Sequence, residues 1–234
     1  MNRLDQIKAF YAILSALERK LGGPRNLLEC NGRMNWPRRG VYFFFEEGEE
    51  RLQSGCGLRV VRVGTHAVRT DNKTTLWSRL YQHRGPLSKE DGDHRGSVFR
   101  RHLGFGISNR NPSLECESWE EDDYPDTPRL QEKEYALEVA VSSYIRRMPL
   151  IWLKVDDWPS PKSKRSYIEK NTIALLSNWR KQAIDPASQN WLGRQSPKEE
   201  IRQSGLWNYD YVDASCDSGF LDLLEKFKAQ MPAA

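Results

Sequence analysis

Residues 40–48, GVYFFFEEG, place a single tyrosine inside a run of apolar residues. A run this apolar predicts a buried strand, and a buried tyrosine usually needs a hydrogen-bond partner for its hydroxyl group. Tyr42 is therefore a candidate for a chemical role. We expect its hydroxyl group to face a charged cleft while Val41, Phe43 and Phe45 face the core. The alternative is a core tyrosine whose hydroxyl group is satisfied by an ordinary hydrogen bond.

A second group of chemically active residues is basic. Residues 94–102, HRGSVFRRH, contain His94, Arg95, Arg100 and Arg101 around one phenylalanine. Such side chains bind the backbone phosphates of nucleic acids, so these four are predicted nucleic-acid-binding residues. A solvated basic loop without a partner would give the same pattern.

Composition and charge narrow the class of protein. The 234 residues suit one domain with accessory segments, and a net charge of +4, from 36 basic and 32 acidic residues, permits nucleic-acid binding without requiring it. The four cysteines lie far apart and form no C-x-x-C pair, which indicates neither a zinc site nor a disulfide framework. No signal-peptide core and no apolar run of membrane-spanning length is present in the sequence. We therefore expect a cytoplasmic protein with no membrane partner.

The elements that must position these side chains follow from hydrophobic spacing and from turn residues. The acidic stretch at 117–126, ESWEEDDYPD, is expected to be a solvated, mobile loop. The pattern as a whole predicts the α+β class. The predicted helices cover residues 4–21, 73–84, 97–104, 131–147, 164–179, 197–203 and 219–229, and the predicted strands cover 41–45, 58–63 and 149–155.

Two tripeptides on the predicted hairpin give the chain a family resemblance. GVY at 40–42 opens the first strand and RVG at 62–64 closes the second. With these tripeptides the chain resembles the GIY-YIG nuclease superfamily, whose two short motifs lie on the two strands of a hairpin. The first tripeptide is close to the family pattern. The second keeps an apolar middle residue and Gly64, a supporting residue, but has Arg62 where the family has a tyrosine.

The order of residues further along the chain strengthens the resemblance. The family follows its second tripeptide with a helix that carries an arginine and, four residues later, a histidine or tyrosine. RLYQH at 79–83 supplies Arg79 and His83 on one predicted helix face. The family then has a strand and a helix with a metal-holding glutamate, and here Glu169 lies in the helix after the strand at 149–155.

The resemblance covers about residues 40–190 and implies a small, mainly antiparallel sheet of three strands with helices on its faces. The family's late asparagine, a supporting residue, matches Asn178 or Asn190, and we prefer Asn190 because it follows a proline-containing turn. The implied organisation is an N-terminal helical extension at 1–35, a GIY-YIG-like domain at 36–195 with a basic and acidic insertion at 85–130, and a C-terminal helical segment at 196–234.

The resemblance implies a metal-dependent endonuclease that hydrolyses DNA phosphodiester bonds. Glu169 would hold a single Mg²⁺ or Mn²⁺ ion, because a carboxylate is a suitable ligand for a hard cation. Arg79 would meet the charge that develops on the phosphate, with two parallel hydrogen bonds. Tyr42, with or without the metal, would activate the attacking water. The implied catalytic residues are thus Tyr42, Arg62, Arg79, His83 and Glu169.

The position of Arg62 relative to Tyr42 can be predicted from the pairing of the hairpin. If the hairpin pairs about a centre near Leu52, Tyr42 and Arg62 lie opposite each other on one face of the sheet. A cation in that position would favour the ionised form of the phenol.

Two other functions remain open. The fold could serve a nucleic-acid-binding module without turnover, since the second motif tyrosine is missing. The chain could also be an interaction subunit that binds a protein partner through the aromatic-rich segment SGLWNYDYV at 204–212.

Overall fold

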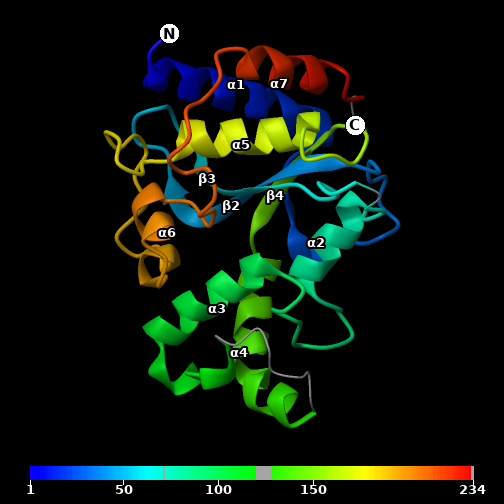
Figure 1. Ribbon diagram of the computed structural model, residues 1–234, viewed down its shortest axis with the longest axis vertical. Coiled ribbons are helices and arrows are strands. Elements are labelled where there is room, and N and C mark those ends of the chain that lie inside the picture. Colours follow the sequence, from blue (N-terminus) through cyan, green and yellow to red (C-terminus); the bar gives the residue numbers. More distant parts are fainter. Residues whose placement is uncertain (71, 120–127, 233–234) are drawn as a thin grey trace.

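The computed structural model describes residues 1–70, 72–119 and 128–232. An antiparallel four-stranded sheet lies in the middle of the fold (Figure 1). In it, β2 (Gly40–Glu50) lies between β3 (Leu58–Gly64) and β4 (Pro149–Lys154), while β1 (Arg25–Asn26) pairs with the other edge of β4. The predicted α+β class is confirmed. The sheet has one strand more than predicted because β1, with two residues, is too short to show an alternating pattern.

Three helices cover one face of the sheet, and they include both ends of the chain (Figure 1). They are α1 (Arg3–Leu21), α5 (Lys164–Leu176) and α7 (Phe220–Ala229). Their apolar side chains form one core with Val41 and Phe43 of β2, both fully buried. The segments before residue 36 and after residue 195 therefore share a core with the sheet.

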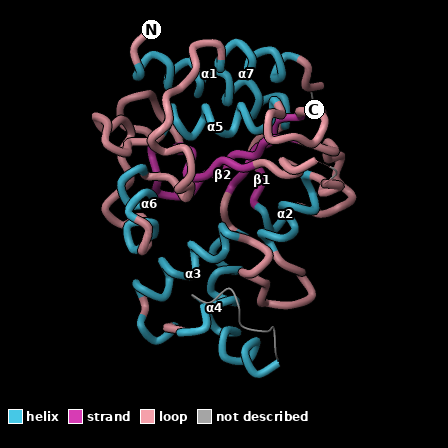
Figure 2. Tube along the Cα trace, in the orientation of Figure 1, coloured by secondary structure: helices cyan, strands magenta, loops and turns pink. Residues whose placement is uncertain are grey.

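Three more helices enclose a second core on the opposite side of the sheet (Figure 2). They are α2 (Leu76–Arg84), α3 (Val98–Arg110) and α4 (Pro128–Arg146). Tyr42 and Phe44 of β2 belong to this second core, and Tyr42 is only 1% exposed. The hydroxyl group of Tyr42 was expected to face a charged cleft, but it is buried in this second core because helices cover both faces of β2.

The segment that follows α6 (Glu199–Ser204) runs beside β3, the edge strand of the sheet (Figure 1). The backbone N–H of Trp207 donates to the carbonyl of Val61 at 2.7 Å. The side chain of Asn208 accepts a hydrogen bond from the N–H of Val63 at 3.0 Å and donates one to its carbonyl at 2.9 Å. The edge of β3 is thereby covered by the chain itself. Short 3-10 helices cover Leu27–Glu29, Pro112–Leu114, Glu117–Trp119 and Leu192–Gln195.

The register of the hairpin differs from the predicted one. Gly64, not Arg62, pairs with Tyr42, and Arg62 pairs with Phe44. The predicted centre of the hairpin at Leu52 is therefore wrong. The pairing of β2 with β3 is regular from Tyr42 to Phe44, and its register shifts beyond Phe44. Side chains alternate along a strand, so Arg62 and Tyr42 still lie on the same face, in diagonal positions.

Within the described parts of the chain, no helix is long and apolar enough to cross a membrane. Residues 120–126 of the acidic stretch, which was expected to be a mobile loop, lie outside the described residues.

Candidate active site

A hollow of about 380 Å³ brings together three of the five side chains expected to act in catalysis. Arg62 comes from β3, Arg79 from α2 and Glu169 from α5. The segment that follows α6 adds residues 208–211 to the wall. Because α2 and α5 pack on opposite faces of the sheet, the two helices can share this hollow only beside β3.

The carboxyl group of Glu169 is half-buried in the hollow. The backbone N–H of Thr65, which directly follows β3, donates to Oε1 of Glu169 at 3.2 Å. Burial raises the pKa of Glu169 from its ordinary 4.5 to about 7, and the negative charge of Asp210 adds to this rise. The charges of Arg62 and Arg79 and the hydrogen bond from Thr65 act in the opposite direction and lower the pKa. Near neutral pH this group therefore exchanges between a carboxylic acid and a carboxylate.

Of the guanidinium groups that line the hollow, those of Arg62 and Arg79 differ in their freedom to move. Arg62 is 8% exposed, donates to the carbonyl of Trp207 at 2.8 Å and lies 4.6 Å from the centre of the Phe99 ring. Its burial lowers its pKa from the ordinary value. Arg79 is only half-buried and donates to the carbonyl of Gly96 at 3.2 Å. Arg79 can therefore turn toward a ligand, whereas Arg62 supplies a fixed charge.

Tyr42 and His83, the other two expected residues, are buried next to Arg62 and do not line the hollow. The hydroxyl oxygen of Tyr42 lies 2.7 Å from Nε2 of His83, and Nδ1 of His83 lies 2.7 Å from the hydroxyl oxygen of Ser97. Burial lowers the pKa of His83 well below its ordinary value, and the charges of Arg79 and Arg62 lower it further. His83 is therefore neutral at pH 7, and one of its ring nitrogens accepts a hydrogen bond.

Gly64 makes room for the phenol of Tyr42. A methyl group on Gly64 would lie 2.2 Å from Cζ and from the hydroxyl oxygen of Tyr42, so the ring lies across a residue that has no side chain. A methyl group on Gly40 would lie 2.4 Å from the carbonyl oxygen of Leu153 on β4. Both motif glycines are thus required by a close approach of other groups.

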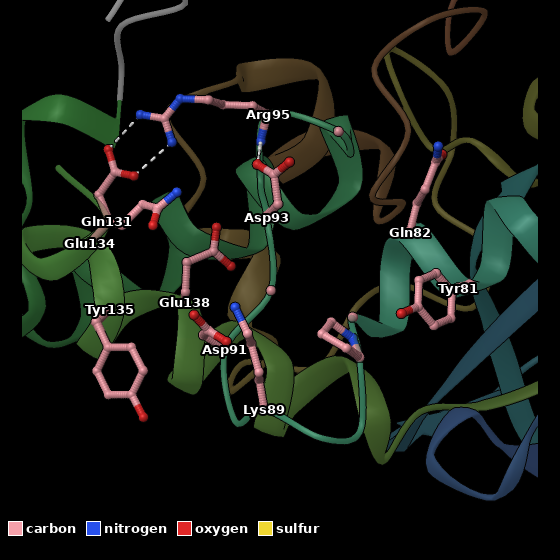
Figure 3. A pocket seen from close by; sticks show the side chains of 14 residues that line it. Tyr81, Gln82, Lys89, Asp91, Asp93, Arg95, Gln131, Glu134, Tyr135 and Glu138 are labelled. Atoms are coloured by element: carbon pink, nitrogen blue, oxygen red, sulfur yellow. Dashed lines mark hydrogen bonds and ion pairs between the residues drawn. The ribbon is translucent and has the colours of Figure 1, made fainter. Parts of the chain in front are cut away.

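Three of the four residues predicted to bind nucleic acid are engaged by glutamates of α4 instead. Arg100 is fully buried and forms an ion pair with Glu138, and Nδ1 of His94 lies 2.9 Å from Oε1 of the same carboxylate. Arg95 binds Glu134 through two hydrogen bonds of 2.7 and 2.8 Å (Figure 3). A phosphate could reach Arg100 or His94 only if Glu138 released them. A solvated phosphate-binding loop at these positions therefore does not fit the structure.

Two further expected residues lie away from the lining of the hollow. Arg101 is half-buried on α3. Asn190 is exposed, and its carbonyl oxygen accepts a hydrogen bond from Arg110 at 2.7 Å. The asparagine that lines the hollow is Asn208, which is bound to Val63 next to the second motif glycine.

Sequence reasoning missed the residues that the segment after α6 brings to the hollow, namely Tyr209, Asp210 and Tyr211. The segment at 204–212 was considered as a surface for a protein partner only in one of the alternative functions. Its tryptophan, Trp207, is instead fully buried in the core of the chain. The sequence signal for these residues was an aspartate between two tyrosines. No spacing rule connects this pattern with β3, which lies about 145 positions earlier in the chain.

Among the described residues, two places are candidates for a metal ion. Glu169 and Asp210 both line the hollow, and carboxylate oxygens suit hard divalent cations. Elsewhere in the described chain, ligand atoms of Asp93, His94 and Glu138 lie within 4.8 Å of one another. Glu138 is already engaged by an arginine and by His94, so the hollow is the better candidate.

Comparison with known proteins agrees with the motif geometry. A family model described as the GIY-YIG domain matches residues 1–233, which is nearly the whole chain. No curated protein and no solved structure matches the chain. The matched range includes α1, the sheet with both motif glycines, and the segment after α6 that completes the hollow. The chain therefore belongs to the GIY-YIG family, whose fold is of the nuclease type.

Proposed function

We propose that the chain is a metal-dependent endonuclease that hydrolyses DNA phosphodiester bonds. The observation that carries this proposal is that Arg62, Arg79 and Glu169 line one hollow in a chain of this family. Hydrolysis requires compensation of the charge that builds on the phosphate and removal of a proton from the attacking water. The hollow and the residues behind it contain groups suited to both tasks.

The two arginines would bind the scissile phosphate. Arg79, half-buried and held by Gly96, can place its planar guanidinium group against two phosphate oxygens. Arg62 is fixed by Trp207 and Phe99, so its charge would act on the transition state without moving. A lysine in place of Arg79 would keep the charge and lose the two-pronged contact.

Glu169 would hold a single Mg²⁺ or Mn²⁺ ion. When bound, such an ion polarises a phosphate oxygen and so stabilises the negative charge of the transition state. Because the pKa of Glu169 is about 7, the carboxyl group must lose a proton before it can bind a cation near neutral pH. We therefore expect cation binding and proton release to be linked.

Tyr42 would take the proton of the attacking water. Its hydroxyl oxygen lies 2.7 Å from Nε2 of His83, and Nδ1 of His83 lies 2.7 Å from the hydroxyl oxygen of Ser97. His83 would position the phenol and remain neutral, because burial and the charges of Arg79 and Arg62 lower its pKa. In its phenolate form, next to the charge of Arg62 and with water admitted from the hollow, Tyr42 would accept one proton and become the neutral phenol.

The burial of Tyr42 favours a second candidate function, a nucleic-acid-binding protein without turnover. Its hydroxyl group is already bonded to His83, and Arg62 stands where the family has its second tyrosine. On this alternative the arginines of the hollow bind phosphate, but no water reaches the phenol.

Cleavage of supercoiled plasmid separates the two functions. We expect nicking with Mg²⁺ or Mn²⁺ and none in EDTA, while gel-shift in EDTA shows binding. Arg79→Lys should reduce cleavage by on the order of a hundredfold, because the bidentate contact is lost. Arg19→Lys, at an exposed position on α1, is the matched control and should cut normally. Binding without any cleavage under all metal conditions would favour the second function.

A further inference from the structure

The wall of the hollow contains apolar groups that phosphate hydrolysis does not use. Val68, Val98 and Tyr211 line it with exposed fractions of 38%, 42% and 46%. The backbone of an intact duplex offers mainly charged and polar groups to a protein. Exposed apolar side chains that gather beside three arginines therefore indicate a ligand with both an anionic and an apolar part.

The ring of Tyr211 is held at the rim of the hollow. Its backbone has φ +63°, a left-handed conformation that is unfavourable for a bulky residue and persists only where the surroundings impose it. Trp207 and Asn208, a few residues earlier, are tied to β3 by three hydrogen bonds. The ammonium group of Lys170 lies 5.8 Å from the centre of the Tyr211 ring. The ring is thus positioned by its segment although almost half of its surface is open.

We propose that Tyr211 stacks on an unpaired base of the substrate, with Val68 and Val98 completing the apolar lining. The enzyme would then prefer DNA in which a nucleotide near the scissile phosphate lies outside the double helix. This inference rests on the proposed function for the identity of the substrate. It goes further in naming the substrate class and the residue that selects it.

A nucleotide is the ligand whose chemistry matches the wall. Its phosphate suits the guanidinium groups of Arg62, Arg69 and Arg79, and its base has a flat apolar face that stacks on tyrosine. In a paired duplex the base faces are covered by their neighbours, so Tyr211 would have nothing to stack on. An unpaired base removes that obstacle at little cost in unstacking energy.

The test compares two DNA probes with full-length protein in EDTA. One probe is a fully paired duplex, and the other is the same duplex with one unpaired 2-aminopurine nucleotide. Affinities are measured by gel-shift, and stacking is measured separately by quenching of the 2-aminopurine fluorescence. The variants are Tyr211→Ala, Tyr211→Phe and, as a matched control, Tyr135→Ala, because Tyr135 has the same exposed fraction of 46% outside this hollow.

We expect the wild type to bind the unpaired probe more tightly than the duplex and to quench its fluorescence. Tyr211→Ala should lower this preference by a factor on the order of 5 to 150, the range for one stacked base. Tyr211→Phe and Tyr135→Ala should retain it. If Tyr211→Ala does not fold, quenching by the wild type and by Tyr211→Phe still decides the question.

The inference is overturned if the wild type shows no preference and no quenching, or if Tyr211→Ala keeps the full preference. Its failure is distinct from that of the proposed function. A wild type that cleaves plasmid but ignores the unpaired base refutes the inference alone. A wild type that stacks on the base but never cleaves refutes the hydrolytic function alone, and a protein that binds neither probe refutes both.

Discussion

Replacing Glu169 by glutamine should stabilise the metal-free protein above pH 7. The glutamine side chain has nearly the same shape, and its amide oxygen can still accept the hydrogen bond from Thr65. The substitution removes only the ability to ionise. In the wild type, ionisation is opposed by burial, which is the main cause of the raised pKa.

The size of the effect follows from the pKa. A carboxyl group whose pKa is raised by folding binds more protons in the folded state, so its contribution to stability is complete below pH 4.5 and is lost as the pH rises through about 7. A rise from 4.5 to about 7 corresponds to a loss of about 3 kcal/mol, at roughly 1.4 kcal/mol per pH unit. Because Glu169 is only half-buried, this value is an upper bound.

Urea unfolding in EDTA measures this difference directly. The free energy of unfolding of Glu169→Gln minus that of the wild type should grow by up to about 3 kcal/mol between pH 4.5 and pH 8. Glu132→Gln, at an exposed position on α4, controls for the substitution itself. Added Mn²⁺ should stabilise the wild type at pH 8 and leave Glu169→Gln unchanged, because a ligand stabilises only the state that binds it.

A difference that does not change with pH would refute this reasoning. It would mean that the Glu169 carboxylate is well solvated or fully compensated by Arg62 and Arg79. A variant that is less stable at pH 8 than the wild type would show that Glu169 forms a stabilising ion pair, and the hollow would then be a structural feature.

Two other perturbations test the surroundings of the hollow. Gly64→Ala should force the phenol of Tyr42 out of place, destabilise the protein by about 1–3 kcal/mol in urea unfolding and reduce plasmid cleavage by on the order of a hundredfold. Gly219→Ala should do neither, because its methyl group would lie 3.4 Å from Oδ1 of Asp217, an ordinary van der Waals contact. Burial lowers the pKa values of His66 and His102 from 6.5 to about 4. Between pH 6.5 and pH 4 the unfolded chain therefore binds more protons than the folded one, so the free energy of unfolding should decrease as the pH falls through this range. Urea unfolding at pH 7 and pH 5 measures this loss in a Glu169→Gln background, which removes the opposing titration of Glu169. Equal stability at the two pH values would contradict the prediction.

The sequence predicted the elements well where a pattern is local. Helical spacing located α1 and α5, and the motif glycines Gly40 and Gly64 located the hairpin. The order of motif residues also identified Arg79 and Glu169, which lie on opposite sides of the sheet and line the same hollow.

The remaining features depend on contacts that no local pattern records. The burial of Tyr42 results from α2 and α3, which pack on the side of the sheet where its hydroxyl group was expected to face a charged cleft. The pairing of Arg100 with Glu138 joins residues 38 positions apart, so the basic run gave no sign that its charge is neutralised. Tyr211 reaches the hollow because its segment packs along the edge of β3, and this long-range contact leaves no local pattern in the sequence.

Plasmid cleavage by Glu169→Gln, measured beside gel-shift of the same preparation, tests the central claim most directly. If Glu169 holds the catalytic cation, cleavage should fall by a factor on the order of a thousand or more, since a metal-borne contribution of several kcal/mol is lost. DNA binding should persist, because one negative charge has been removed from a hollow that binds phosphate. A Glu169→Gln protein that cuts at nearly the wild-type rate would contradict the account and place the cation elsewhere.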